Sequence, residues 1–208
     1  MITSMCNSYE HTIVITNRHL VQGDFLKQLE KVTKLHPHAL ILREKDLTDD
    51  AYESLAKKVF DLCKREDITF FLHTKIEIAR KIGCQNIHLS IPVLKGLSET
   101  EKKALTEDFC EISISCHSME DVEIAMAGGA TQIILGTIFE TECKKGVLGK
   151  GVEFVREICQ KCPLPVYAIG GMNLQRLPLV IDAGAAGCCM MSGFMQTTKT
   201  LQKSVFIT

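Results

Sequence analysis

The sequence lacks an excess of charge of either sign. It carries 24 Lys and Arg residues against 25 Asp and Glu residues, so that the formal net charge is -1 at pH 7. It also has no basic tract with interleaved aromatic residues, which is the usual electrostatic footprint of a nucleic-acid or acidic-membrane partner. We therefore expect no nucleic acid and no membrane among the partners of this protein.

Long hydrophobic runs are missing as well. No apolar run approaches the roughly 20 residues that a helix needs to cross a bilayer, and the first residues, MITSMCNSYEH, lack the basic and apolar regions of a secretory signal. The sequence thus predicts a cytoplasmic protein. A chain of 208 residues with 46% hydrophobic residues can bury a large core, and we expect one domain over residues 1–208.

The cysteines do not form the pattern of a disulfide scaffold or of a zinc site. The chain has ten cysteines, but many of them lie inside apolar runs, which is typical of buried, reduced thiols. Cys159 and Cys162 form a single CxxC, without a second one and without a well-spaced histidine. We assign no metal site to these residues.

What the sequence does contain is a regular alternation of short apolar runs and longer stretches with helical periodicity. The runs hold few polar residues, as is typical of parallel strands that helices cover on both faces. They are 11–16, 39–43, 69–72, 86–89, 110–115, 132–136, 164–169 and 187–191.

The stretches between the runs have helix signals. Thr48 is placed to cap a helix with the apolar stripe Ala51, Leu55, Val59, Leu62 and Cys63, and Ser98 with Glu101 has the spacing of a capping box. Eight strand and helix units predict a (β/α)8 TIM barrel. The alternative is an open, doubly wound sheet. That fold usually carries GxGxxG after its first strand, where this chain has Thr16-Asn17-Arg18.

In such a barrel the polar residues that follow each strand meet at one mouth. The cations Arg43, Lys45 and Lys144 would lie there, together with Gly170-Gly171 and Ser192-Gly193 after the last two strands. Barrels often bind phosphate at this position through backbone N–H groups and a helix N-terminus. The Gly- and Lys-rich loop 137–151 would be typical of a solvated surface segment if it stood alone. With the rest of the mouth it indicates a phosphorylated ligand.

Several of these segments also carry a family resemblance. LREK (42–45), SCHS (115–118), GTIFETECKKG (136–146), AIGGM (168–172) and AGAAG followed by MSG (191–193) resemble thiamine phosphate synthase and its relative, the TenI-type thiazole tautomerase. The similarity runs from about Thr12 to Met195. It implies a (β/α)8 barrel that binds a small phosphorylated thiazole, with the phosphate held by Gly170, Gly171 and Ser192.

The resemblance to the synthase is incomplete. That enzyme joins thiazole phosphate to a pyrimidine diphosphate and uses Mg²⁺ to neutralise the departing pyrophosphate. The resemblance implies substrate contacts at Arg43, Lys45, Ser115, Thr141 and Lys144. Where the synthase has an Asn-Asp pair after strand three, this chain has His73-Thr74, and the acidic motif after strand four reads SIPV (90–93). We therefore expect no cofactor, and Mg²⁺ only if the chain is a synthase.

The loop FETECKKG (139–146) is more similar to the tautomerase branch, whose proton transfer needs no metal. The catalytic histidine of that branch matches Thr137 here, so His117 and His73 become the candidate bases, because histidine titrates near neutrality. His117 could instead simply bond a neighbouring backbone group. Glu44 is a further candidate base, although an ion pair with Arg43 or Lys45 is the better interpretation.

Three functions follow, in order of preference. The first is a thiazole tautomerase, the second is a thiamine phosphate synthase, and the third is a barrel that binds a thiamine intermediate without turning it over. The segment after Met195 is short for an eighth barrel helix. A homo-oligomer, in which a partner subunit completes the last seam, is a further expectation.

Overall fold

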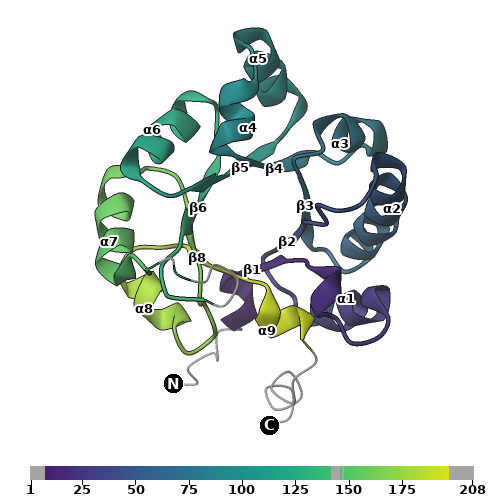
Figure 1. Ribbon diagram of the computed structural model, residues 1–208, viewed down its shortest axis with the longest axis horizontal. Helices are drawn as coiled ribbons and strands as arrows, with labels where there is room; N and C mark the ends of the chain where they lie inside the picture. The colour runs from purple at the N-terminus through teal and green to yellow at the C-terminus, as the bar shows by residue number, and fades with distance from the viewer. Residues whose placement is uncertain (1–7, 142–145, 147, 197–208) are drawn as a thin grey trace, which may run out of the picture.

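Eight parallel strands close into a barrel in the order β1 to β8 (Figure 1). The computed structural model describes residues 8–141, 146 and 148–196. The strands are β1 (Thr12–Ile15), β2 (Ala39–Leu42), β3 (Thr69–His73), β4 (Asn86–Ser90), β5 (Glu111–Cys116), β6 (Gln132–Gly136), β7 (Val166–Ile169) and β8 (Gly187–Met190). This confirms the predicted (β/α)8 fold, whereas the extent of a single domain over residues 1–208 stays a prediction.

Helices surround the ring of strands on its outer side (Figure 1). The α-helices are α1 (Phe25–Thr33), α2 (Asp49–Arg65), α3 (Ile76–Ile82), α4 (Ile91–Gly96), α5 (Glu99–Asp108), α6 (Met119–Ala127), α7 (Gly151–Lys161), α8 (Leu177–Asp182) and α9 (Ser192–Met195), and two short 3-10 helices, η1 (Ser8–His11) and η2 (Arg18–Leu20), flank β1. Residues 197–208, on which the expected thin seam partly depends, lie outside the described residues.

The local signals in the sequence explain most helix boundaries. Thr48 caps α2 by accepting a hydrogen bond from the backbone N–H of Ala51 at 3.4 Å, and Ser98 and Glu101 form the expected capping box. The apolar stripe of α2 is rotated by one residue at its start. Ala51 is exposed, and Tyr52 is buried in its place because its hydroxyl group binds a carbonyl at the end of β2.

The buried side chains form two layers, as the alternation of strand residues requires. One set fills the barrel lumen and includes Ile13, Ile15, Ile41, Phe71 and Ile134. The other, larger set lies between the strands and the helices. The expected burial of thiols holds for Cys84, Cys188 and Cys189, whereas Cys110 is exposed because it precedes the first residue of β5. The filled lumen gives the mouth a rigid floor.

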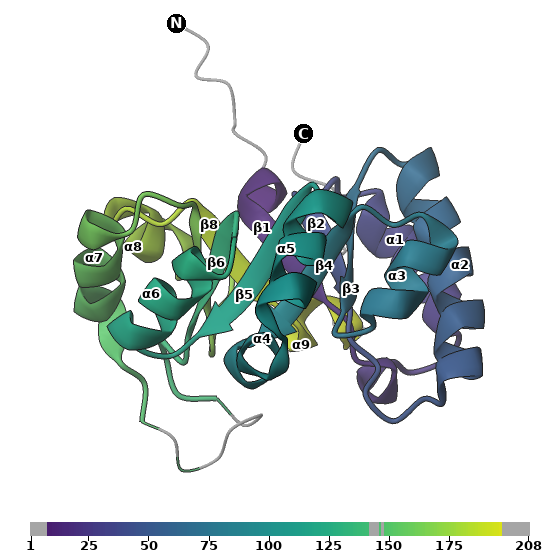
Figure 2. The same cartoon turned by 90° about the horizontal axis from the view of Figure 1, so that it is seen from above.

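The carboxyl ends of the strands share one end of the barrel. Figure 2 shows α4 and α9, which directly follow β4 and β8, at this end. We call this end the mouth. Among the described residues, no helix is long and apolar enough to cross a membrane.

Candidate active site at the mouth of the barrel

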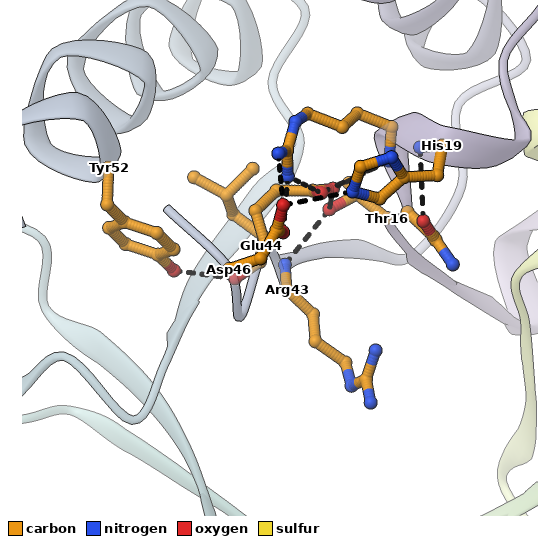
Figure 3. Close-up of polar contacts among 9 residues, drawn as sticks. Thr16, His19, Arg43, Glu44, Asp46 and Tyr52 are labelled. Carbon is orange, nitrogen blue, oxygen red and sulfur yellow. Dashed lines mark hydrogen bonds and ion pairs between the residues drawn. The ribbon is translucent and has the colours of Figure 1, made fainter. Parts of the chain in front are cut away.

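Arg43 is the first residue after β2, and it is partly buried at the mouth. Its backbone N–H donates to the hydroxyl oxygen of Thr16 at 2.9 Å. In Figure 3 its side chain runs away from the polar cluster that surrounds its backbone. Within the described part of the chain, the guanidinium group has no hydrogen bond or ion pair. An uncompensated cation at the mouth is suited to bind an anionic ligand.

Glu44 points to the opposite side, toward the loop that follows β1. Its side chain is only 1% exposed. It accepts hydrogen bonds from the hydroxyl of Thr16 at 2.7 Å and from the backbone N–H of Arg18 at 3.0 and 3.1 Å. Its ion-pair partner is Arg18, at 3.1 Å between Nη1 and Oε2. The expected pair with Arg43 or Lys45 is therefore wrong, because side chains alternate along the chain at the end of a strand.

Arg18 also forms an ion pair with a second carboxylate, that of the exposed residue Asp46. The guanidinium group of Arg18 donates from both terminal nitrogens to Asp46, and His19 lies 3.0 Å from the same carboxylate (Figure 3). The hydrogen bond from Arg18 holds the pKa of Asp46 well below its usual range, and Asp46 in turn raises the pKa of Arg18. This cluster ties the loop after β1 to the loop after β2.

His73 and His88 lie near the mouth end of the lumen, with ring centroids 5.6 Å apart. His88 on β4 contacts the hydroxyl groups of Ser113 and Ser115, each at 2.9 Å. Burial lowers the pKa of His88 to about 3. Burial, followed by the charges of Arg43 and Lys45, lowers the pKa of His73 to about 4. Both rings are neutral near pH 7. His73 is thus a weaker base than the sequence predicts.

His117 and Thr137 do not form an acid–base pair with each other in the described hydrogen bonds. The Nδ1 of His117 lies 2.5 Å from the carbonyl oxygen of Gly136, and Lys150 donates to the carbonyl oxygen of His117. Thr137 is 6% exposed, and its carbonyl accepts from the backbone N–H of Lys150 at 3.0 Å. His117 therefore makes the contact to a neighbouring backbone group that the sequence left open as the alternative to catalysis.

A second part of the mouth, at the ends of β7 and β8, is built from backbone. Gly170 and Gly171 follow β7 with φ values of 102° and 60°, a region that favours glycine. A Cβ atom on Gly170 would meet Cγ2 of Thr137 at 2.5 Å, and one on Gly171 would meet the carbonyl oxygen of Glu140 at 2.6 Å. Ser192 and Gly193 are exposed at the start of α9, after β8. The predicted phosphate-binding residues therefore follow neighbouring strands, and their role stays a prediction.

The remaining predicted contacts are spread around the mouth. Lys45 is exposed two residues after Arg43, and Ser115 bonds His88 from β5. Thr141 is partly buried in the connection after β6. Lys144 lies outside the described residues. The structure thus brings four of the predicted residues to one part of the mouth. Arg43 and Lys45 follow β2, His73 is the last residue of β3, and Ser115 lies near the end of β5.

The described residues offer no ready-made set of protein ligands for Mg²⁺. Residues 8–141, 146 and 148–196 contain no group of three or more His, Cys, Asp or Glu side chains that could hold a metal ion. Both oxygens of the buried Glu44 carboxylate are already engaged by Thr16 and Arg18. Mg²⁺ prefers carboxylate oxygens together with substrate phosphates, and the ends of β3 and β4 offer His73 and Ser90 instead.

The fold and this mouth define a (β/α)8 barrel of the kind that binds small ligands at the carboxyl ends of its strands. Residues 12–194 match the family described as thiamine monophosphate synthase. The chain is 31% identical over 180 residues to the thiamine-phosphate synthase of Coprothermobacter proteolyticus, covering 86% of this chain and 84% of the relative. The chain belongs to this family, which confirms the resemblance seen in the sequence.

Other comparisons agree. The thiamine-phosphate synthase of Fusobacterium nucleatum is 27% identical over 196 residues, which cover 92% of either chain. A solved thiamine phosphate pyrophosphorylase from Pyrococcus furiosus superposes with a TM-score of 0.80 at 22% identity, covering 94% of this chain and 92% of its own. That likeness supports the fold.

The preferred expectation of a thiazole tautomerase is wrong. The relatives carry the name of the synthase, and the matching family is described as thiamine monophosphate synthase. The geometry gives physical reasons. Thr137 has no basic group, the ring of His117 is engaged by the carbonyl of Gly136, and His73 has a pKa of about 4.

Sequence analysis missed the roles of Thr16, Arg18 and Tyr52 in this site. Thr16 and Arg18 follow β1, and Glu44 follows β2, which is its neighbour in the barrel. Opposite charges at the ends of adjacent strands were a usable signal. The role of Tyr52 had no such signal, because it depends on how helix α2 packs against the end of β2.

Proposed function

We propose that this protein has thiamine-phosphate synthase activity. The reaction forms a C–N bond between the thiazole nitrogen and the methylene carbon of the pyrimidine diphosphate, while the C–O bond to pyrophosphate breaks and pyrophosphate leaves with the electron pair. The membership of the family supports this class of reaction. The geometric observation that carries the proposal is the guanidinium group of Arg43, which faces the mouth without a partner among the described residues.

Arg43 would bind the pyrophosphate end of the substrate, and Lys45 would add to the positive potential there. The charges of both residues lower the pKa of His73, so their electric field reaches the end of β3. A leaving group that gains negative charge in the transition state is stabilised by such fixed cations. The rings of His73 and His88 are neutral near pH 7 and so do not repel the cations, and both ring nitrogens of His88 are held by Ser113 and Ser115.

The phosphate of the thiazole would bind at the ends of β7 and β8, next to β1 in the barrel. Gly170 and Gly171 follow β7, and Ser192 and Gly193 follow β8, where backbone N–H groups can approach an anion. Two anionic groups would then bind at separate places, with the reacting atoms between them. Thr141 and Lys144 would contribute from the connection after β6, and the possible homo-oligomer stays a prediction.

A second candidate is a barrel that binds these compounds without turnover. It is favoured by one observation, the absence of a ready-made set of metal ligands among the described residues. The decisive experiment incubates the purified protein with thiazole phosphate and the pyrimidine diphosphate, in Mg²⁺ and in EDTA, and measures thiamine phosphate and pyrophosphate. Equal amounts of both products support the synthase. Binding of the substrates without either product, in both buffers, supports the binder and rejects the synthase.

A further inference from the structure

The peptide group between Leu42 and Arg43 is fixed by buried side chains at both of its polar ends. Its carbonyl oxygen accepts a hydrogen bond from the hydroxyl of Tyr52 at 2.6 Å, and its N–H donates to the hydroxyl of Thr16 at 2.9 Å. Thr16 is fully buried and Tyr52 is 1% exposed. This peptide lies at the end of β2, where the ladder between strands ends, so side chains replace the missing ladder partners.

Each hydroxyl group also makes a second hydrogen bond, to a residue at the end of a strand. Thr16 donates to Glu44 at 2.7 Å, and Glu44 is held in turn by Arg18. Tyr52 accepts from the backbone N–H of His73 at 3.2 Å, at the end of β3. A continuous chain of hydrogen bonds therefore joins the ends of β1, β2 and β3 beneath the mouth.

This arrangement fixes Arg43 from two directions. The peptide group before it is held by Tyr52 and Thr16, and the side chain after it, Glu44, is held on the side of β1. Because successive side chains at a strand end point to opposite sides, the Cα–Cβ bond of Arg43 is directed away from the cluster, as Figure 3 shows.

We propose that Thr16, Glu44, Arg18 and Tyr52 are positioning residues that direct Arg43 toward an anionic ligand through this hydrogen-bond chain. The inference rests on the proposed function only for the role of Arg43 as the ligand for a diphosphate. The positioning residues act without touching the ligand. Preorganised groups of this kind avoid the cost of ordering a long side chain when the ligand binds.

The test measures the affinity for inorganic pyrophosphate by titration calorimetry in EDTA. Thr16→Val removes the hydroxyl but keeps the shape of the side chain, and we expect the affinity to fall about 10-fold, since small misplacements of a binding group are costly. Thr16→Ser restores the hydroxyl and should bind like the wild type. Thr12→Val is the matched control, because Thr12 is also fully buried on β1 but bonds Tyr9 at 2.8 Å, at the start of the strand. It should change the affinity less than 2-fold.

The same substitution in the Arg43→Ala background separates positioning from general damage. If Thr16 acts through Arg43, Thr16→Val has less than a 2-fold effect once the guanidinium is gone. An equal loss in both backgrounds, or an equal loss for Thr12→Val, overturns the inference. If Thr16→Val does not fold, as judged by its thermal transition, Tyr52→Phe decides by the same criterion, because it acts on the other end of the same peptide group.

The two proposals fail in different ways. A wild-type protein that does not bind pyrophosphate overturns the positioning inference, whether or not thiamine phosphate is formed. A wild-type protein that binds pyrophosphate but forms no thiamine phosphate rejects the synthase. The positioning inference then stands or falls on the affinities of the Thr16 variants alone.

Discussion

The two parts of the mouth that we propose as anion sites are built in different ways. The side formed by β1 to β3 presents a charged side chain, Arg43, that buried hydrogen bonds hold from below. The side formed by β7 and β8 presents backbone at glycines with positive φ, Gly170 and Gly171. The first side depends on a network of polar side chains, whereas the second depends on the absence of side chains.

This difference determines how each side should respond to mutation. A substitution in the network removes one or two hydrogen bonds, so we expect a partial loss of affinity that can be measured in a folded protein. At Gly170 and Gly171, by contrast, any added Cβ atom would clash with neighbouring atoms, so every substitution should lower the stability of the fold. We therefore expect the largest effects on stability on the glycine side and the clearest effects on binding on the arginine side.

The largest effect is expected for Gly170→Ala. The new Cβ atom would meet Thr137 at 2.5 Å and the residue would keep a φ of 102°, so we expect a loss of about 2–5 kcal/mol in the free energy of unfolding. Gly23→Ala is the matched control, with a φ of 108° and no atom within 4 Å of the new Cβ. Urea denaturation of both variants separates the conformational cost from the clash. Equal losses would show that the packing around Gly170 is not the cause.

Acid should weaken the fold through the histidines of the lumen. The pKa of His73 is lowered from 6.5 to about 4, and that of His88 from 6.5 to about 3. Burial also lowers the pKa of His38. The unfolded chain therefore takes up protons at a higher pH than the folded one. Stability is greatest above pH 6.5 and is lost as the pH falls toward 4.

Between pH 6.5 and pH 5 we expect a loss of about 1.5 kcal/mol for each of His73 and His88, measured as the free energy of unfolding in urea. His73→Gln should reduce the slope by up to about 1.4 kcal/mol per pH unit in this window. An unchanged slope in the variant would mean that His73 titrates alike in the folded and unfolded chain. The measurement tests whether His73, at the end of β3 near Arg43, is shielded from water in the folded protein.

Arg43→Ala should reduce the affinity for pyrophosphate by about 10- to 100-fold, because one charge-assisted contact contributes about 1.5–3 kcal/mol. Arg65→Ala is the control, since Arg65 is exposed at the end of α2. Calorimetry at two salt concentrations should also show a weaker salt dependence for Arg43→Ala than for the control. Equal affinities for the two variants would remove Arg43 from the site, and with it the contrast between the two sides of the mouth.

Much of the fold was predictable from the sequence, and less of the site. The expected run 132–136 coincides with β6, and the capping box at Ser98 is present, because both depend on neighbours in the chain. The partner of Glu44 was predicted wrongly, since it depends on which strand lies beside β2 and on which side the side chain points. The pKa of His73 was also unpredictable, because burial is its main cause.

The smallest effect is expected for Asp46→Asn, and it tests which part of the Arg18 cluster matters. Asp46 and Glu44 bind the same guanidinium group, but the side chain of Asp46 is 51% exposed and that of Glu44 is 1% exposed. Exposed ion pairs contribute about 0–1 kcal/mol because water and salt compete for both charges. We therefore expect the free energy of unfolding of Asp46→Asn to stay close to that of the wild type, with the affinity for pyrophosphate unchanged. A larger loss would show that the exposed carboxylate, rather than the buried one, holds Arg18 in place, and the hydrogen-bond chain beneath Arg43 would then extend to the surface.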